Sequence, residues 1–117
     1  MAQELEDLRV YSVAREMCAR AYRLSADVAD TDLRDQIRRA ATSVVLNIAE
    51  GRGRGSDADF ARCIAIARGS NYELTAQLQM AMTLGILGDC AALVAELQQL
   101  GRMLSALINR LRMDRRN

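Results

Sequence analysis

The sequence has no histidine, proline, tryptophan or lysine, and its aromatic residues are one phenylalanine and three tyrosines. Without histidine, Ser-His-Asp and Cys-His catalytic groups cannot form, and zinc or di-iron sites that use histidine are excluded. Without proline, nothing forbids long uninterrupted helices. The residues that dominate instead are strong helix formers, above all Ala, Leu and Arg. The composition therefore predicts an all-α protein.

The length and net charge of the chain further limit the kind of protein that it can be. A chain of 117 residues is long enough for a single domain, 1–117, and its formal net charge of +1 gives it no general attraction to nucleic acid. The three cysteines lack CxxC spacing, which favours free thiols in a reducing compartment. The N-terminus is acidic rather than signal-like, and no apolar run reaches the roughly 18 residues of a membrane span. We therefore expect a cytoplasmic protein that does not contact a membrane.

Hydrophobic periodicity gives the architecture. Apolar residues recur at spacings of three and four in four segments, 8–28, 31–51, 57–84 and 90–112. The last segment carries leucines at heptad spacing, at positions 93, 97, 100, 104, 107 and 111. Because the connections between the segments are short, neighbours in sequence should be antiparallel neighbours in space. The pattern predicts an antiparallel up-down-up-down four-helix bundle.

Polar and glycine residues mark the expected helix ends. Asp30, Ser56 and Asp89 precede helical segments and can accept hydrogen bonds from the first free amides. Gly51 follows the second segment and is expected to end it in the left-handed conformation. The glycine-rich run 51–56 lacks the lysine of a phosphate-binding loop and follows a helix rather than a strand, which excludes that motif.

A second set of small and apolar residues lies beside the main stripes. Its members are Ala61, Ala65, Gly69 and Ala76 in the third segment, and Val94, Gly101, Ser105 and Ile108 in the fourth. One interpretation is a surplus apolar face that is buried between copies of the chain, which makes a homo-oligomer. The other is a broad stripe used inside a single bundle. We expect the homo-oligomer.

Several polar residues lie on or beside the apolar stripes. We expect Asn47, Glu50, Ser70 and Glu73, together with Arg39, to form a structural polar network. Glu73 should pair with Arg39, since the two lie at comparable depth on antiparallel helices and a lone buried carboxylate is costly. Asn47 and Glu50 should bond backbone groups near the 51–56 loop. No substrate pocket is visible around Glu50 or Glu73, so we expect no enzyme, no catalytic residue, no metal and no cofactor.

Arginine is unevenly placed, and all basic residues of the chain are arginines. Guanidinium groups suit phosphate contacts, which makes the loop and the C-terminal tail candidates for nucleic-acid binding. The candidates are Arg52, Arg54, Arg110, Arg112, Arg115 and Arg116. The alternative is that they are ordinary solvated charges, with the last four favouring a helix C-terminus.

Several short segments between residues 38 and 74 carry a family resemblance. The run RRAATSVVLNIAEG at 38–51, the DFAR at 59–62 and the IARGS at 66–70 followed by Glu73-Leu74 resemble the central signature of the "four helix bundle protein" family. These bacterial proteins are also called rRNA intervening-sequence proteins, because the first were recognised as reading frames inside insertions in 23S rRNA genes. The family includes relatives of the accessory variability determinant protein of diversity-generating retroelements. The segment 26–32 is shorter here than the corresponding segment in the family. The lysines that are common in the family are absent from this sequence.

The resemblance implies an up-down-up-down bundle, often a ring-like homopentamer, and for some members association with RNA or a reverse transcriptase. Our leading hypothesis is a non-enzymatic oligomeric bundle that binds RNA or a ribonucleoprotein through Arg-rich surfaces. The alternative is a protein-interaction scaffold that binds no nucleic acid. No small-molecule substrate is indicated by either.

Overall fold

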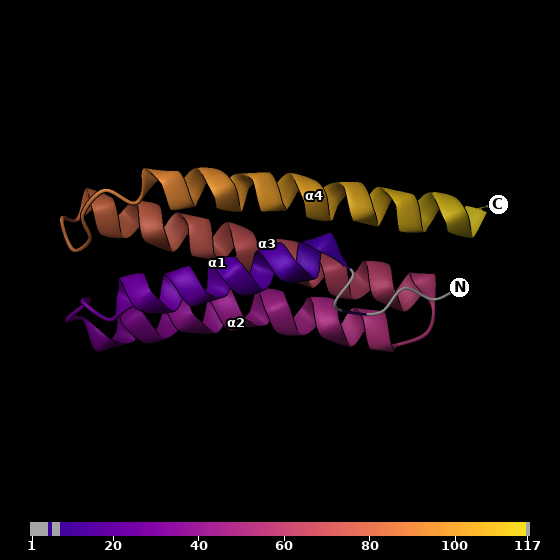
Figure 1. Cartoon of the computed structure of the whole chain (residues 1–117), viewed down its shortest axis with the longest axis horizontal. Helices are drawn as coiled ribbons and strands as arrows, with labels where there is room; N and C mark the ends of the chain where they lie inside the picture. Colours follow the sequence, from indigo (N-terminus) through magenta and orange to yellow (C-terminus); the bar gives the residue numbers. More distant parts are fainter. Residues whose placement is uncertain (1–4, 6–7, 117) are drawn as a thin grey trace.

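The computed structural model describes residue 5 and residues 8–116, with side chains as far as residue 113. This part of the chain forms four helices and no strand: α1 (Arg9–Ser25), α2 (Thr31–Gly53), α3 (Asp57–Thr83) and α4 (Ala91–Arg116). The helices lie along the long axis of a particle of 50 × 20 × 19 Å and run alternately in opposite directions (Figure 1). The predicted all-α four-helix bundle is confirmed.

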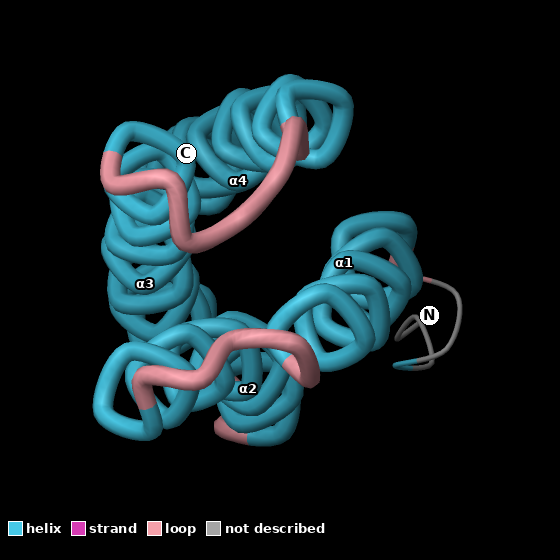
Figure 2. The backbone as a smooth tube through the Cα atoms, turned by 90° about the vertical axis from the view of Figure 1, so that its left-hand side faces the viewer, coloured by secondary structure: helices cyan, strands magenta, loops and turns pink. Residues whose placement is uncertain are grey.

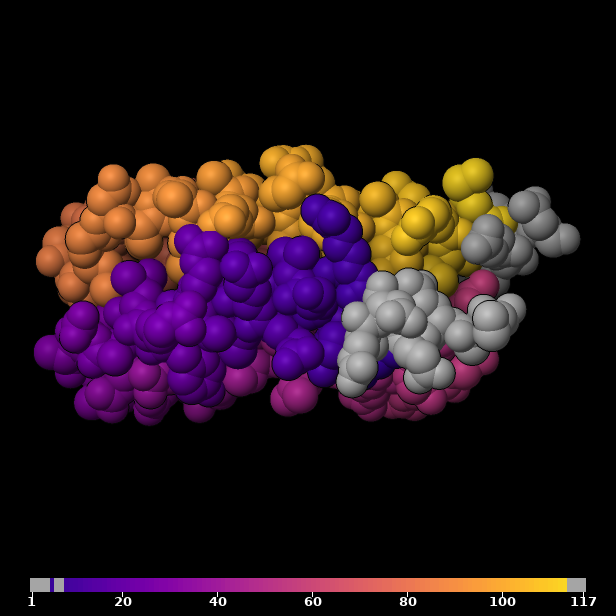
Figure 3. Space-filling view, viewed as in Figure 1, coloured from indigo at the N-terminus to yellow at the C-terminus, as the bar shows by residue number. Residues whose placement is uncertain are grey.

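The four helices surround one core, and α1 is the least firmly held. Figure 2 shows them in the order α1, α2, α3, α4 around the bundle axis. The α2–α3 and α3–α4 contacts are the most extensive, and the α1–α4 contact is the smallest of the four. One reason is length, since α1 has 17 residues and α4 has 26. Figure 3 shows α1 at the front of the bundle, with α4 along the upper edge of α1. An ion pair between Arg20 and Glu96 joins the two helices.

The apolar stripes are buried as the periodicity predicts. All six heptad leucines of α4 are buried, and Leu97 and Leu104 are completely so. Val94 and Ile108, which lie off the leucine stripe, are buried within the same chain. For these two residues the broad stripe is therefore the correct interpretation, and they contribute nothing to a surface for a second copy.

Side-chain caps begin three helices where the sequence places them, and at α4 the Asp89 carboxylate accepts a hydrogen bond from the Ala91 amide at 2.9 Å. The Asp30 carboxylate accepts a hydrogen bond from the Leu33 amide at 3.0 Å, and the Ser56 hydroxyl accepts one from the Asp59 amide at 3.2 Å. The end of α1 differs from the predicted 28. The helix stops at Ser25. Val28 lies in the turn that follows, where its side chain is still buried in the core and its amide donates to the Ser25 carbonyl at 3.0 Å.

The predicted end of α2 at Gly51 is wrong. Gly51 lies inside the helix, which continues to Gly53, and the left-handed backbone occurs at Gly55, with φ of 87°. A Cβ on Gly51 would lie only 2.7 Å from the Cβ of Cys63 and 3.0 Å from Phe60 Cδ1. Glycine is needed at this position because α2 and α3 approach each other closely, and not because the helix stops. The fourth helix also exceeds its expected end at 112 and continues to residue 116.

Candidate nucleic-acid interface

The fold brings the two predicted arginine clusters to one end of the bundle. The α2–α3 loop and the C-terminal part of α4 both lie at the end of the long axis where the C-terminus is drawn in Figure 1. We call this the basic end. Its described arginines are Arg52, Arg54, Arg62, Arg110 and Arg112. Of the predicted residues, Arg115 and Arg116 belong to α4, but their side chains lie outside the described part of the structure.

Acidic neighbours partly offset the charge of the basic end. Arg54 donates to Glu50 at 3.0 Å, and the hydrogen bond and charge of Glu50 raise the pKa of Arg54. Arg62 donates to Asp59 at 3.3 Å. Both ion pairs are exposed, and exposed pairs are weak because water screens them. A phosphate group can therefore replace either carboxylate at little cost.

The arginines of α4 at the basic end differ from Arg54 and Arg62 in their neighbours. Arg110 and Arg112 are exposed, and no ion pair to a described carboxylate holds them. Both lie near the C-terminus of a helix, where cations stabilise the helix dipole. They can fill that structural role and still present their guanidinium groups to a ligand.

The predicted polar network forms in part. Asn47 donates to the Ser43 carbonyl at 2.9 Å and to the Ser43 hydroxyl at 3.1 Å, and that hydroxyl contacts the Ser70 hydroxyl at 2.8 Å. This chain of contacts joins α2 to α3 through Ser43, a residue that the sequence analysis did not single out. Asn47 therefore bonds to Ser43 of its own helix rather than to the 51–56 loop as expected, and Ser43 makes the contact across to α3.

The predicted pair between Arg39 and Glu73 is wrong. Both residues are exposed, and the Glu73 carboxylate accepts a hydrogen bond from Gln77 of its own helix at 3.3 Å. Comparable depth along two helices does not bring two side chains together when both face outward. Glu50, the other carboxylate of the expected network, is likewise exposed and pairs with Arg54.

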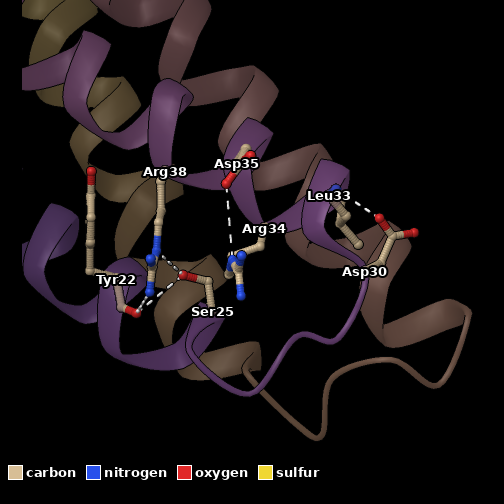
Figure 4. A network of polar contacts seen from close by, with 7 residues as sticks. All are labelled: Tyr22, Ser25, Asp30, Leu33, Arg34, Asp35 and Arg38. Atoms are coloured by element: carbon tan, nitrogen blue, oxygen red, sulfur yellow. Dashed lines mark hydrogen bonds and ion pairs between the residues drawn. The ribbon is translucent and has the colours of Figure 1, made fainter.

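Arg38, at the opposite end of the bundle, joins α1 to α2. Its Nε donates to the Ser25 hydroxyl at 2.9 Å and its Nη2 to the Tyr22 carbonyl at 3.1 Å (Figure 4). The guanidinium also lies over the Tyr22 ring, 4.7 Å from its centroid. Arg38 thus fastens the last turn of α1 to α2. The sequence offered only the neighbouring pair Arg38-Arg39, without a signal for which of them turns inward.

A groove of about 830 Å³, lined by polar and apolar groups, runs along the outer surface between α3 and α4. Its sides include the exposed residues Tyr72, Gln79, Gln98 and Asn109, and its buried part includes Asn71. The Asn71 side chain is 2% exposed and donates to the Leu97 carbonyl at 2.7 Å, while its Oδ1 has no partner among the described residues. We call this the α3–α4 groove.

A smaller groove lies on the opposite face of the bundle, between α1 and α2. It measures about 300 Å³ and is almost wholly apolar, with Cys18, Ala19, Val45 and Leu46 in its lining. Leu46 is 64% exposed, which is high for a leucine in a bundle helix. We call this the α1–α2 groove.

The rest of the described chain offers little further chemistry. Cys18, Cys63 and Cys90 are free, and burial raises the pKa of the Cys18 and Cys90 thiols, which keeps them protonated and unreactive. Within the described residues, no group of three or more Cys, Asp or Glu side chains could hold a metal ion. No helix in the same part of the chain is long and apolar enough to cross a bilayer.

Comparison with known families agrees with the signature at 38–74. No curated protein matches the chain. The model of the 23S rRNA-intervening sequence protein family matches residues 6–106, which include α1, α2, α3 and most of α4. The chain therefore belongs to the 23S rRNA-intervening sequence protein family.

Proposed function

We propose that this protein is a non-enzymatic RNA-binding bundle that holds the RNA backbone at the basic end. The observation that carries the proposal is the convergence of Arg52 and Arg54 with Arg110 and Arg112, which are separated by about half of the sequence. Phosphate attraction depends on how many cations lie together, because each contact releases counterions from the nucleic acid. Four guanidinium groups at one end act together, whereas two separate pairs would bind weakly.

The test compares two variants with equal loss of charge. The first replaces Arg52, Arg54, Arg110 and Arg112 by Ala. The second replaces Arg15, Arg23, Arg34 and Arg39 by Ala, which lie on α1 and α2 outside the basic end and outside the α3–α4 groove. Fluorescence anisotropy with a short labelled RNA should show binding by the wild type, at least tenfold weaker binding by the first variant, and a much smaller loss for the second. Equal losses in the two variants, or no binding by the wild type, would contradict the proposal.

The chain is also proposed to self-associate through the α1–α2 groove, in a homo-oligomer such as the pentamer that the family resemblance implies. Support comes from Leu46, whose exposed side chain lies in an apolar groove with Val45 and Cys18. Burying such a patch against a second copy removes apolar surface from water. If the groove contacts a different surface of its neighbour, the contact repeats and closes a ring. A ring repeats the basic end in each copy and so strengthens a weak phosphate attraction.

Sedimentation or light scattering tests the self-association. Leu46→Glu places a charge in the α1–α2 groove and should reduce the measured mass toward 12.9 kDa, the mass of one chain. The matched control is Leu84→Glu, because Leu84 is 62% exposed but lies beyond the end of α3. A wild-type protein that has the mass of one chain would rule out the homo-oligomer.

We also propose that the protein is cytoplasmic, because its cysteines are free thiols.

The second candidate function is a protein-interaction scaffold, and the apolar α1–α2 groove favours it. The two functions separate in a pull-down from nuclease-treated extract. A partner that remains bound after the treatment and is lost with Leu46→Glu would favour the scaffold, whereas loss of all partners on nuclease treatment would favour RNA.

A further inference from the structure

The α3–α4 groove has a lining that suits an unpaired nucleotide. Amide side chains line it from both helices, with Asn71 and Gln79 from α3 and Gln98 and Asn109 from α4. An amide offers both a donor and an acceptor, which is what the exposed edge of a nucleobase requires. The volume of about 830 Å³ lies within the range of roughly 300–1,000 Å³ that is usual for small-ligand sites.

An aromatic face is available beside these amides. Tyr72 lines the groove and is 68% exposed, more than any other large hydrophobic residue in the described part of the chain. An exposed ring next to hydrogen-bonding groups is the usual platform for a single-stranded base. Tyr22 is used differently, since Arg38 already lies over its ring.

Charge favours the same ligand. The groove lining contains Arg102 and no acidic residue, so no carboxylate repels a phosphate. A second cation lies at the edge, where Arg68 donates to the groove residue Ser105 at 3.2 Å. In the basic end, by contrast, acidic residues stand beside the arginines. The groove thus accepts an anionic ligand without first displacing an ion pair with a carboxylate.

The groove also leads into the basic end. Its lining follows α4 from Gln98 to Asn109, a distance of about 16 Å at the rise of an α-helix. Arg110 and Arg112 come next on the same helix. A strand whose phosphates contact these arginines therefore reaches the groove without a gap.

One polar atom in the groove wall still lacks a partner. Asn71 is 98% buried, and although its amide nitrogen donates to the Leu97 carbonyl, its Oδ1 accepts no hydrogen bond from the described residues. Buried acceptors are nearly always satisfied in folded proteins. This acceptor is enclosed, and Asn71 also lines a small interior space beside Ala14 and Val44, so Oδ1 is not among the groups that the groove offers to a base.

We propose that the α3–α4 groove binds unpaired bases of an RNA strand, with Tyr72 stacking on a base and the amides of Gln79, Gln98 and Asn109 bonding to base edges. This inference rests on the proposed function for the ligand, and it adds a site that distinguishes single strands from duplexes. In a duplex the bases are already stacked and paired, so only the basic end can contribute.

The test uses a single-stranded RNA that contains 2-aminopurine, whose fluorescence falls when the base stacks, and a duplex of the same strand with its complement. Tyr72→Ala should weaken single-strand binding about tenfold and abolish the fluorescence change, while duplex binding stays within about twofold. Tyr72→Phe keeps the ring and should behave like the wild type. Gln98→Ala should weaken single-strand binding several-fold, and Gln36→Ala, an exposed amide on α2, should not.

Each other outcome is decisive. If Tyr72→Ala binds the single strand and changes its fluorescence as the wild type does, or if the wild type causes no change, the groove proposal is overturned. If Tyr72→Ala instead alters the mass of the assembly and leaves RNA affinity unchanged, the groove holds a second copy and the proposal is again overturned. If the fluorescence change depends on Tyr72 but survives loss of the four basic-end arginines, the groove proposal stands and the basic-end proposal fails.

Discussion

The two ends of the bundle have opposite charge and different construction. The end with the α1–α2 and α3–α4 turns carries Asp27, Asp30, Asp32, Asp35 and Asp89, and we call it the acidic end. There an arginine is used structurally, because Arg38 bonds to Ser25 and Tyr22. At the basic end Arg110 and Arg112 are exposed and Arg54 and Arg62 lie in exposed ion pairs, and close packing at Gly51 joins α2 to α3.

This difference shows how a nearly neutral chain can still present a basic surface. Net charge of +1 describes the whole sequence, whereas a ligand meets one end of a particle 50 Å long. Charges at the far end lie several screening lengths away, since the Debye length is about 8 Å at physiological ionic strength. The acidic end therefore does little to weaken phosphate attraction at the basic end.

The largest stability effect is expected at Gly51. Gly51→Ala adds a Cβ that meets Cys63 Cβ at 2.7 Å and the Phe60 carbonyl oxygen at 3.3 Å, so α2 and α3 must move apart. Overpacking of this kind should lower the free energy of unfolding in urea by about 1–3 kcal/mol. The matched control is Gly69→Ala, which is also helical but has open space around it and should raise the same quantity by about 0.5–1 kcal/mol. Equal effects of the two changes would refute the close approach.

At the acidic end, the matched pair is Arg38 and Arg39. Arg38→Ala removes two hydrogen bonds and the contact with the Tyr22 ring, and should lower the free energy of unfolding by about 1–2 kcal/mol. Arg39→Ala changes an exposed side chain and should stay within about 0.5 kcal/mol. Thermal denaturation of both variants measures the difference, and a larger effect at Arg39 would count against the assigned role of Arg38.

Removing the helix cap at either end of the bundle should have a smaller effect on stability, of the same size at both ends. Asp30→Ala at the acidic end and Ser56→Ala at the basic end each remove one bond to a free amide. Each should lower the free energy of unfolding by about 1 kcal/mol. Amide hydrogen exchange should locate the change in the first turn of α2 for Asp30→Ala and of α3 for Ser56→Ala. Exchange that rises evenly along the chain would show that neither cap acts locally.

The sequence predicts those features that depend on neighbours in the chain. Four apolar stripes, the six leucines of α4 and the caps at Asp30 and Ser56 follow from spacing and local hydrogen bonding, and the structure confirms them. Gly51 was misread because a glycine after an apolar stripe fits both a helix end and a close helix crossing. Only the position of Phe60 and Cys63 on α3 decides between them.

The candidate sites depend on contacts between helices, which spacing specifies only in part. Short loops predict the antiparallel order of the helices, and in the structure that order places the 51–56 loop and the α4 C-terminus at one end. Rotation of each helix about its own axis was not fixed, so the Arg39–Glu73 pair was wrong and the contact between Ser43 and Ser70 was missed. The α3–α4 groove was missed for the same reason, because it requires two polar stripes to face the same side.

The salt dependence of RNA binding tests the central claim most directly. The logarithm of the binding constant should fall linearly with the logarithm of salt concentration, with a slope of about −0.7 for each phosphate contacted in a single strand. Replacing Arg52, Arg54, Arg110 and Arg112 by Ala should make that slope shallower by about 2–3. A slope that is the same in this variant and in the wild type would mean that the basic end does not contact RNA.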